Sequence, residues 1–429
     1  MMKSLTSAGS SDLIERLKPK SEFSRNVLTL MTGTTIAQAI PIAISPILTR
    51  IYTPEDFGVF ALFVAITSIF GSIASGRYEL AIILPKKDED AINIFALGFI
   101  ITTLMSSILL LAIYLFHDFI ASLLRNNEIE NWLYFAPIVV FFIGLFNLLS
   151  YFNNRKKNYK DIANTTIVKS IIMAIVQLSV GFIKNGAAGL IGGQLASQIF
   201  ANVKLFKNIL QDKIIISKIS KLQILAQARR YKNFPKFSMW GILANSLSFH
   251  LTNILISFFY TIATLGFYSL VQRVLGIPST LVGSSIGQIF FQQASHEKKL
   301  TGKAINTFRT TLKKLVMIGL LLFISLFFII EALFAFIFGE EWRIAGTYAQ
   351  ILIPMFFLRF VSSSVSSTLI IFEKHKMELL INLILISVSI LLILLSHNFL
   401  SFLYYYTTFM GISYTVFLVY YHSVSKGSR

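Results

Sequence analysis

The sequence predicts an all-α membrane protein with about twelve transmembrane helices in two six-helix bundles around a central cavity. Of its 429 residues, 55% are hydrophobic and only 14% are charged, whereas a soluble domain carries about 25% charged residues. The mean hydropathy is +0.70, and the apolar residues fall into stretches of roughly 20, the length that crosses a bilayer as a helix. A soluble globular protein is therefore excluded.

Twelve such stretches follow one another along the chain, separated by short polar loops. We place them, within a few residues, at 27–49, 57–76, 91–116, 133–152, 163–183, 187–206, 239–259, 266–290, 315–338, 346–371, 379–396 and 399–421. The segment before the first span is polar and acidic in places, so we expect no cleavable signal peptide there. The short loops leave no room for a large catalytic domain.

Charge predicts the orientation of these spans. The net charge is +18, and nearly all of the 38 Lys and Arg residues fall on the side that carries both termini and the even-numbered loops. The exceptions are Arg50, Arg125, Lys184 and Arg343 on the other side, and Lys169, Arg273 and Arg359 inside spans. Since Lys and Arg concentrate in cytoplasmic loops, we expect both termini in the cytoplasm. This topology accounts for the positive charge, so we expect no nucleic-acid partner.

The longest loop divides the chain into two groups of six spans. The predicted organisation is an N-terminal cytoplasmic tail (1–26), an N-terminal bundle (27–206), a basic cytoplasmic linker (207–238), a C-terminal bundle (239–421) and a C-terminal tail (422–429). The linker includes an amphipathic stretch from about Ile214 to Ala228.

The two groups share a short pattern. A shift of 208 residues places Tyr52, Thr53, Gly58, Phe60 and Leu62 opposite Tyr260, Thr261, Gly266, Tyr268 and Leu270. Because each half has an even number of spans, both halves enter from the same face of the membrane. This predicts a parallel internal repeat with a cavity between two bundles, which is the architecture of a transporter.

Three cations fall inside spans, where a charged residue costs about 2.5 to 3.5 kcal/mol and normally faces the bundle interior or water. Arg359 is near the middle of its span, Arg273 is in the outer half of its span, and Lys169 is close enough to the cytoplasmic end to reach headgroups. Arg keeps its charge and needs an anion or water, so we favour substrate binding for Arg359 and Arg273 and leave Lys169 open. Arg77, at a cytoplasmic span end, either binds substrate at the entrance or pairs with Glu79.

Polar residues at helical spacing form stripes on four spans. They are Gln38 with Thr34, Ser45 and Thr49; His250 and Asn253 with Ser246 and Ser257; Gln272 with Gly276, Thr280, Ser284 and Gln288; and Ser363 and Ser366 beside Arg359. Each stripe either forms hydrogen bonds between helices or lines a polar cavity. We favour packing for most of the small residues and for His250. We keep Gln38, Gln272, His250, Asn253 and Ser363 as candidate substrate contacts.

Carboxylates are scarce in the spans. Glu331 is the only one well inside a span, and it and His250 are the candidates for ion coupling. Buried bases with few buried acids indicate an anionic cargo. The chain has no cysteine, no phosphate-binding loop and no paired-His zinc motif, so we expect no metal, no cofactor and no enzymatic activity.

Five segments along most of the chain match motifs of a known family. They are Leu48–Gly58, Gly76–Ile82 with Leu84 and Pro85, Tyr231–Pro235, Gly266–Tyr268 with Gln272–Leu275, and Phe338–Trp342 with Ala345 and Gly346. In combination they resemble the Wzx-type polysaccharide flippases, the O-antigen and capsule translocases of the multidrug/oligosaccharidyl-lipid/polysaccharide exporter superfamily.

The resemblance implies a two-bundle fold of fourteen or twelve helices that alternates between inward-open and outward-open states. Its cargo would be an oligosaccharide linked to undecaprenyl pyrophosphate, moved to the periplasmic leaflet for lipopolysaccharide or capsule assembly. A pyrophosphate is a compact polyanion that Arg binds bidentately, and Arg359, Arg273, Arg77 and Lys169 could supply the cationic site. The expected partners are this lipid, membrane lipids and other polysaccharide-assembly proteins.

Two alternatives are open. Multidrug exporters of the same superfamily have an acidic residue in the first span for cation coupling, but residues 27–49 contain none. A cation-coupled multidrug antiporter therefore ranks second. A membrane-embedded polysaccharide polymerase ranks third, because the outward loops are too short for one.

Overall fold

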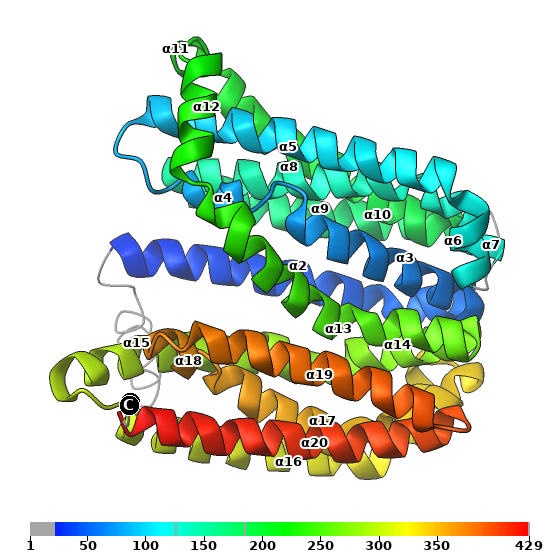
Figure 1. Ribbon diagram of the computed structural model, residues 1–429. Helices are drawn as coiled ribbons and strands as arrows, with labels where there is room; N and C mark the ends of the chain where they lie inside the picture. Colours follow the sequence, from blue (N-terminus) through cyan, green and yellow to red (C-terminus); the bar gives the residue numbers. More distant parts are fainter. Residues whose placement is uncertain (1–21, 125–126, 184–185, 428–429) are drawn as a thin grey trace, which may run out of the picture.

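The protein is a bundle of long helices that share one axis. The computed structural model describes residues 22–124, 127–183 and 186–427, and Figure 1 shows the N-terminal helices lying above the C-terminal ones. The long N-terminal helices are α2 (Glu22–Ile51), α3 (Pro54–Ile73), α5 (Asp88–Leu115), α8 (Ala136–Arg155), α9 (Tyr159–Gly181) and α10 (Ala188–Leu210). The long C-terminal helices are α13 (Met239–Phe259), α14 (Ile262–Ile277), α16 (Ile305–Phe338), α17 (Arg343–Val365), α19 (His375–Leu395) and α20 (Phe399–Ser425). The predicted all-α fold of about twelve helices in two bundles is confirmed.

Short helices connect the long ones. They are α4 (Tyr78–Ala81), α6 (His117–Leu124), α7 (Asn127–Leu133), α11 (Lys213–Ile216), α12 (Lys221–Arg230), α15 (Ser284–Thr301), α18 (Thr368–Ile371), two π-helical turns η1 (Phe234–Ser238) and η2 (Pro278–Gly283), and a 3-10 turn η3 (Glu340–Trp342). Much of the predicted N-terminal tail, Arg125, Lys184 and the last two residues lie outside the described residues.

Eleven helical segments in the described part of the chain have the length and apolar composition needed to cross a membrane, and α10 is not among them. The buried Asn202 of α10 is hydrogen-bonded inside the N-terminal bundle, where its Nδ2 donates to the carbonyls of Phe142 and Gln198 at 3.2 and 2.6 Å. Since buried polar groups cost little when they are hydrogen-bonded, α10 can serve as the twelfth span beside α9.

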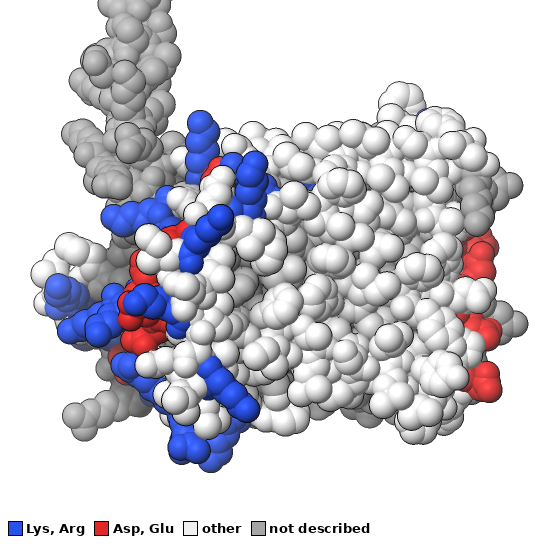
Figure 2. All heavy atoms as spheres, turned by 90° about the horizontal axis from the view of Figure 1, so that it is seen from above, with Lys and Arg blue, Asp and Glu red and all other residues white. Residues whose placement is uncertain are grey.

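The two ends of the bundle differ in charge. Lys and Arg gather at one end, where α8, α10 and α15 finish with Arg155, Lys207 and Lys298, and few charges lie between the ends on the face in Figure 2. We call this the basic end. Acidic residues mark the opposite, acidic end, at the start of α3 (Glu55) and in η3 (Glu340).

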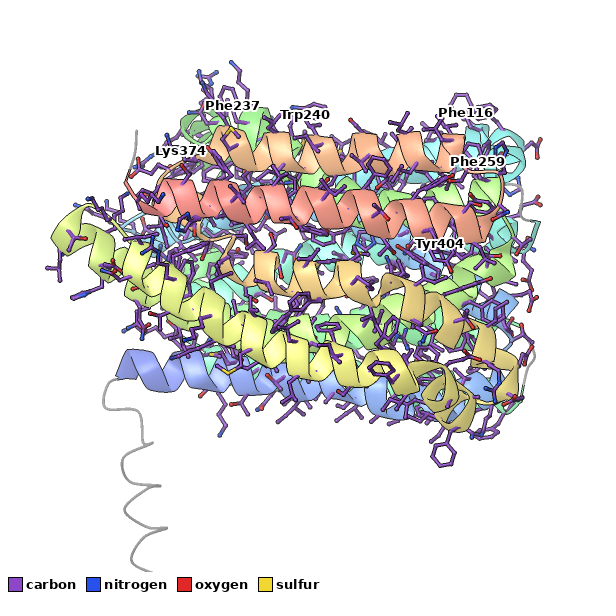
Figure 3. All side chains as sticks on the ribbon, turned by 90° about the horizontal axis from the view of Figure 1, so that it is seen from below. Phe116, Phe237, Trp240, Phe259, Lys374 and Tyr404 are labelled. Atoms are coloured by element: carbon purple, nitrogen blue, oxygen red, sulfur yellow. The ribbon has the colours of Figure 1, made fainter. Side chains whose placement is uncertain are left out.

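Aromatic side chains mark both borders of the apolar belt. Figure 3 shows Phe237 and Trp240 near the basic end, with Lys374, and Phe116, Phe259 and Tyr404 near the acidic end. Between these borders large apolar side chains face outward, for example Leu321, which is 79% exposed. Aromatic residues are enriched at both membrane interfaces, so this surface is that of a multi-pass membrane protein.

The two bundles meet most closely where α3 crosses α14 near the acidic end. A Cβ atom added at Gly58 would lie 2.0 Å from the carbonyl oxygen of Ile262, and one added at Gly266 would lie 1.8 Å from that of Pro54. Since Gly58 and Gly266, like Pro54 and Ile262, are 208 residues apart, the contact is reciprocal, as in a twofold-symmetric interface. Only glycine permits backbones to approach this closely.

Trp342 fills the space beside this crossing. Its buried indole donates from Nε1 to the carbonyl of Thr49 at 3.1 Å. Its ring packs edge-on against Phe57 of α3 and Phe267 of α14, with centroids 5.0 and 5.5 Å away. We call Gly58, Gly266, Trp342 and these two Phe residues the acidic-end seam, because they join the two bundles there.

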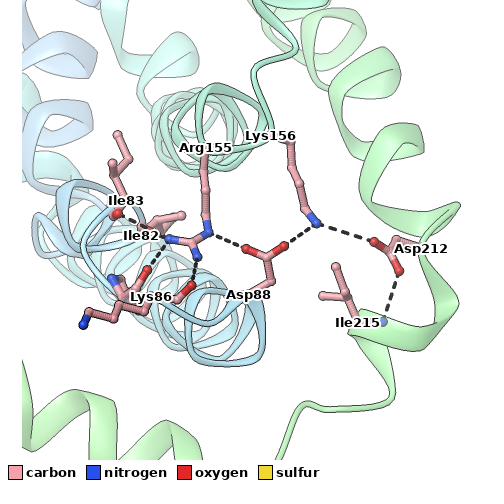
Figure 4. Close-up of polar contacts among 9 residues, drawn as sticks. Ile82, Ile83, Lys86, Asp88, Arg155, Lys156, Asp212 and Ile215 are labelled. Carbon is pink, nitrogen blue, oxygen red and sulfur yellow. Dashed lines mark hydrogen bonds and ion pairs between the residues drawn. The ribbon is translucent and has the colours of Figure 1, made fainter.

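Arg155 holds the loops of the N-terminal bundle at the basic end (Figure 4). Its guanidinium pairs with Asp88 at 2.7 Å and donates to four carbonyl groups between residues 82 and 86. Lys156 bridges Asp88 and Asp212, at 2.7 and 3.7 Å, and so joins the α4–α5 loop to α11. One side chain at the end of α8 therefore fixes the backbone of a whole loop.

The amphipathic stretch of the linker contains two short helices, α11 and α12. The chain turns between α11 and α12, and Asn93 of α5 binds this turn: its Nδ2 donates to the carbonyl of Lys218 at 3.0 Å, and its Oδ1 accepts from Ser220 N at 2.9 Å. These bonds replace helical hydrogen bonds, so a tertiary contact ends α11.

Replacing Gly266 with Ala should lower the melting temperature of the purified protein by several degrees. The new Cβ must push α14 away from α3, and overpacking of this kind costs about 1 to 3 kcal/mol. The melting temperature is measured in detergent by light scattering. Gly192→Ala in α10 is the matched control, because nothing lies within 4 Å of its added Cβ. Equal melting temperatures for the two variants would contradict the close crossing.

Replacing Arg155 with Ala should destabilise the protein by about 2 kcal/mol or more, because Asp88 and several carbonyls lose a largely buried partner. Thermal unfolding again measures the change. Lys160→Ala, at an exposed position five residues further on, should stay within about 0.5 kcal/mol of the intact chain. If the two substitutions had similar effects, Arg155 would not hold the loop.

Candidate functional site

A cavity of about 370 Å³ lies between α3, α13, α14 and α17. Five of the side chains that the sequence marked as candidate substrate contacts line it together: Arg359, Arg273, Gln272, His250 and Asn253. They come from three helices of the C-terminal half, while Phe60, Ala61 and Val64 of α3 complete the wall from the N-terminal half. We call this the cationic cavity.

Arg359 is held by aromatic rings. Its Cζ lies 4.9 Å from the centroid of Phe249 and 5.6 Å from that of Phe356. Such contacts stabilise a guanidinium through the ring quadrupole and leave its N–H groups available. No carboxylate in the described part of the chain lies within ion-pair distance of Arg359, so the group keeps its charge for another anion.

Arg273 is positioned by the other half of the protein. Its Nη1 donates to Ser45 Oγ of α2 at 3.2 Å, and the Ser45 hydroxyl in turn donates to the carbonyl of Pro41 at 2.6 Å. A guanidinium has five N–H donors, so most remain free. Within the described residues Arg273 also has no carboxylate partner. Two unneutralised guanidinium groups in one cavity make a site for an anion.

Asn253 adds a neutral polar group to the same wall. Its side chain is 7% exposed, and its Oδ1 is buried without a hydrogen-bond partner among the described residues. A buried amide oxygen usually accepts a hydrogen bond, so a donor group of a bound molecule would satisfy Oδ1.

Two larger hollows lie toward the basic end. One, of about 940 Å³, lies beside α2, η2, α15 and α17 and includes Ser363. The other, of about 780 Å³, lies among η1, α13 and α19 and includes Arg77, Lys236 and Trp240. The structure therefore separates Ser363 and Arg77 from the cationic cavity.

Arg77 fits both sequence interpretations. It has a left-handed backbone (φ 66°) at the start of α4, and its Nη1 lies 3.0 Å from Glu79 Oε1. Glu79 is 1% exposed and also accepts the Ser75 hydroxyl. The Nε of Arg77 is buried without a partner among the described residues. The ion pair anticipated as the alternative is present, and the guanidinium still lines a hollow.

Three other candidates lie outside the cationic cavity. Lys169 Nζ lies over the ring of Phe146, 5.0 Å from its centroid, within the N-terminal bundle. Gln38 is exposed on α2, seven residues before Ser45. Glu331 lies at the acidic end, with Oε1 3.6 Å from Nη1 of Arg343. The cavity thus contains His250 but not Glu331.

Ionisable groups at the acidic end lie apart from the cationic cavity. Burial, together with the charges of Asp56 and Glu55, raises the pKa of Glu128. The ring nitrogens of His117 lie 3.4 and 3.6 Å from carboxylate oxygens of Asp118 and Glu130.

The aromatic residues that hold Arg359 were not predicted from the sequence. Phe356 lies three residues before Arg359 on the same helix, so helical spacing could have identified it. Phe249 comes from α13, and no pattern in the sequence links it to Arg359. Ser279 was also missed: it lies in the π-helical turn η2, where it lines both the cationic cavity and the 940 Å³ hollow.

Comparison with known proteins identifies the family. The family model described as "Polysaccharide biosynthesis protein" matches residues 47–346. The succinoglycan biosynthesis transport protein ExoT of Rhizobium meliloti (strain 1021) is 23% identical over 313 residues, which are 70% of this chain and 59% of that protein. The chain thus spans less than two thirds of the length of this relative.

Solved structures of transporters share the fold. The lipid II flippase MurJ, in an inward closed conformation, superposes with a TM-score of 0.70 at 13% identity, over 92% of this chain and 86% of that one. An inward-facing multidrug resistance MATE transporter of the MOP superfamily gives a TM-score of 0.58 at 12% identity, over 92% and 94%. These matches confirm the resemblance inferred from the five sequence segments. The chain belongs to the polysaccharide biosynthesis protein family and has the fold of the MOP superfamily.

Proposed function

We propose that the protein is a flippase that moves an oligosaccharide linked to undecaprenyl pyrophosphate across the bacterial inner membrane by alternating access. The observation that carries this proposal is the pair of guanidinium groups, Arg359 and Arg273, in one cavity without a carboxylate partner among the described residues. A pyrophosphate would supply the missing negative charge, and Arg binds its oxygens through paired N–H donors. The family match and the name of the relative ExoT support a polysaccharide intermediate as cargo.

The arrangement of the cavities supports a state in which the substrate enters from the basic end. The acidic-end seam joins the bundles on one side of the cationic cavity, and both larger hollows lie on the other side, toward the basic end. With the basic end in the cytoplasm, the site faces the leaflet on which the lipid-linked precursor is made. The headgroup would enter beside Arg77, Lys236 and the exposed Trp240, while the lipid tail stays in the bilayer.

A cation-coupled multidrug antiporter is the second candidate. A cationic cargo would need a carboxylate in the cavity, but the lining has two Arg residues and no acid. The MATE structures share the fold, and fold alone does not define cargo. His250, which lines the cavity, and Glu331 remain proposals for ion coupling.

Replacing Arg359 with Ala should reduce surface glycan at least tenfold and cause lipid-linked precursor to accumulate, because the headgroup loses a charged donor. A host lacking its own copy of the gene is complemented with each variant, and surface glycan is examined on gels. Arg359→Lys should restore only part of the activity, because Lys keeps the charge without the planar fork.

Arg343→Ala is the matched control for this series. Arg343 lies on the same helix but at the acidic end, where it forms exposed ion pairs with Glu340 and Glu331. Such pairs contribute about 0 to 1 kcal/mol, so surface glycan should be normal. Normal glycan in Arg359→Ala, at equal protein level in the membrane, would remove Arg359 from the mechanism. Altered sensitivity to cationic drugs with unchanged glycan would favour the antiporter.

The proposed orientation predicts which end can be labelled from outside. The chain contains no cysteine, so one introduced thiol is the only one. In spheroplasts, a membrane-impermeant maleimide should label Glu341→Cys at the acidic end and should label Thr301→Cys at the basic end only after lysis. Both positions are exposed. The reverse pattern would place the basic end outside.

A further inference from the structure

The 940 Å³ hollow differs chemically from the cationic cavity. We call it the hydroxyl chamber and define it by Ser279, Gln288, Gln292, Ser295, Ser363 and Ser367. None of the described side chains that line it is charged. Its size lies within the roughly 300 to 1,000 Å³ of small-molecule sites.

Several polar groups of the chamber have no partner in the protein. The Oγ atoms of Ser279 and Ser367 are buried and make no hydrogen bond among the described residues. Gln288 and Gln292 are exposed and four residues apart, so their amides project from one face of α15 into the chamber. Buried hydroxyls normally find a partner. Hydroxyls and amides that each donate and accept fit a ligand rich in hydroxyl groups.

Close packing shapes the wall behind these groups. A Cβ added at Gly283 would lie 2.8 Å from Ser364 Oγ, and one at Gly287 would lie 3.0 Å from the Ser364 carbonyl oxygen. The helix segment from η2 to α15 is thus held directly against α17. Pro278, which has no N–H group, begins the π-helical turn η2. Such turns occur frequently at functional sites.

The chamber lies directly beside the cationic cavity. Ser279 lines both. On α17, Arg359 faces the cationic cavity, and Ser363, one turn later, faces the chamber, a step of about 6 Å along the helix. A ligand with an anionic group at Arg359 would therefore place the next part of its headgroup among the Ser and Gln side chains.

We propose that the hydroxyl chamber binds the sugar residue attached to the pyrophosphate, and that this sugar is uncharged. The proposal rests on the proposed function. The amides of Gln288 and Gln292 and the free Ser hydroxyls bond to ring hydroxyls or an N-acetyl group. A sugar carboxylate would find no counter-charge there, and an unpaired charge removed from water is costly. The chamber therefore selects neutral sugars at this position.

The test compares two lipid probes on the full chain in nanodiscs: undecaprenyl pyrophosphate alone, and the same lipid carrying one N-acetylglucosamine. The intact chain should bind the sugar-bearing probe about tenfold more tightly, from two or more added hydrogen bonds. In the double variant Gln288→Ala/Gln292→Ala the two probes should bind equally, with the affinity for the bare lipid unchanged. A probe carrying glucuronic acid should bind the intact chain no better than the bare lipid.

Gln293→Ala is the matched control, because Gln293 is exposed on the same helix and does not line the chamber. It should keep the tenfold preference, and the melting temperatures of all variants should agree. Arg359→Ala should weaken the binding of both probes equally, so the ratio of their affinities should stay the same.

Two results would contradict sugar binding in the hydroxyl chamber and leave the proposed flippase function unaffected. One is that the intact chain binds the bare lipid and the sugar-bearing lipid equally well. The other is that the double variant keeps the preference for the sugar-bearing lipid. Failure of both probes to bind the intact chain would overturn the proposed function and the chamber together.

Discussion

The arrangement of this protein depends on one steric constraint, the crossing of α3 and α14 without side chains between them. Gly58 and Gly266 let the backbone of each helix touch the other at reciprocal positions, and Trp342 fills the space beside them. Because the bundles are joined at the acidic end, the space between them lies toward the basic end. The cationic cavity and both hollows follow from where this contact is made.

Two guanidinium groups are accommodated in the bundle by neutral partners and not by carboxylates. Phe249 and Phe356 hold Arg359 through their π faces, and a single hydroxyl of α2 orients Arg273. A carboxylate would have stabilised either group more strongly, but it would have competed with an anionic ligand. The protein therefore positions both charges with weak neutral partners and leaves them without a counter-charge among the described residues.

The spans and the charge difference between the ends could be predicted because each depends on local composition. Helical spacing likewise placed Arg359 and Ser363 on one face of α17. Spacing could not show that a π-helical turn after Pro278 separates two cavities, or that Phe249 meets Arg359, since both depend on how helices pack. The 208-residue shift paired the two glycines, but only the structure shows that each contacts the backbone of the other's helix. Neighbouring residues in the sequence did predict the ion pair of Arg77 with Glu79, whereas the hollow that Arg77 also lines depends on how η1, α13 and α19 pack.

A reciprocal contact within one chain has an evolutionary consequence. In a homodimer every substitution appears on both sides, whereas a chain that carries both copies can change one alone. The cavity shows this divergence: Ala61 and Val64 of α3 line it opposite Ser269 and Gln272 of α14, which occupy the positions 208 residues later. The two halves share a common scaffold, but the side chains at equivalent positions differ. In this cavity the C-terminal half supplies the charged and amide side chains, and α3 of the N-terminal half supplies an apolar wall.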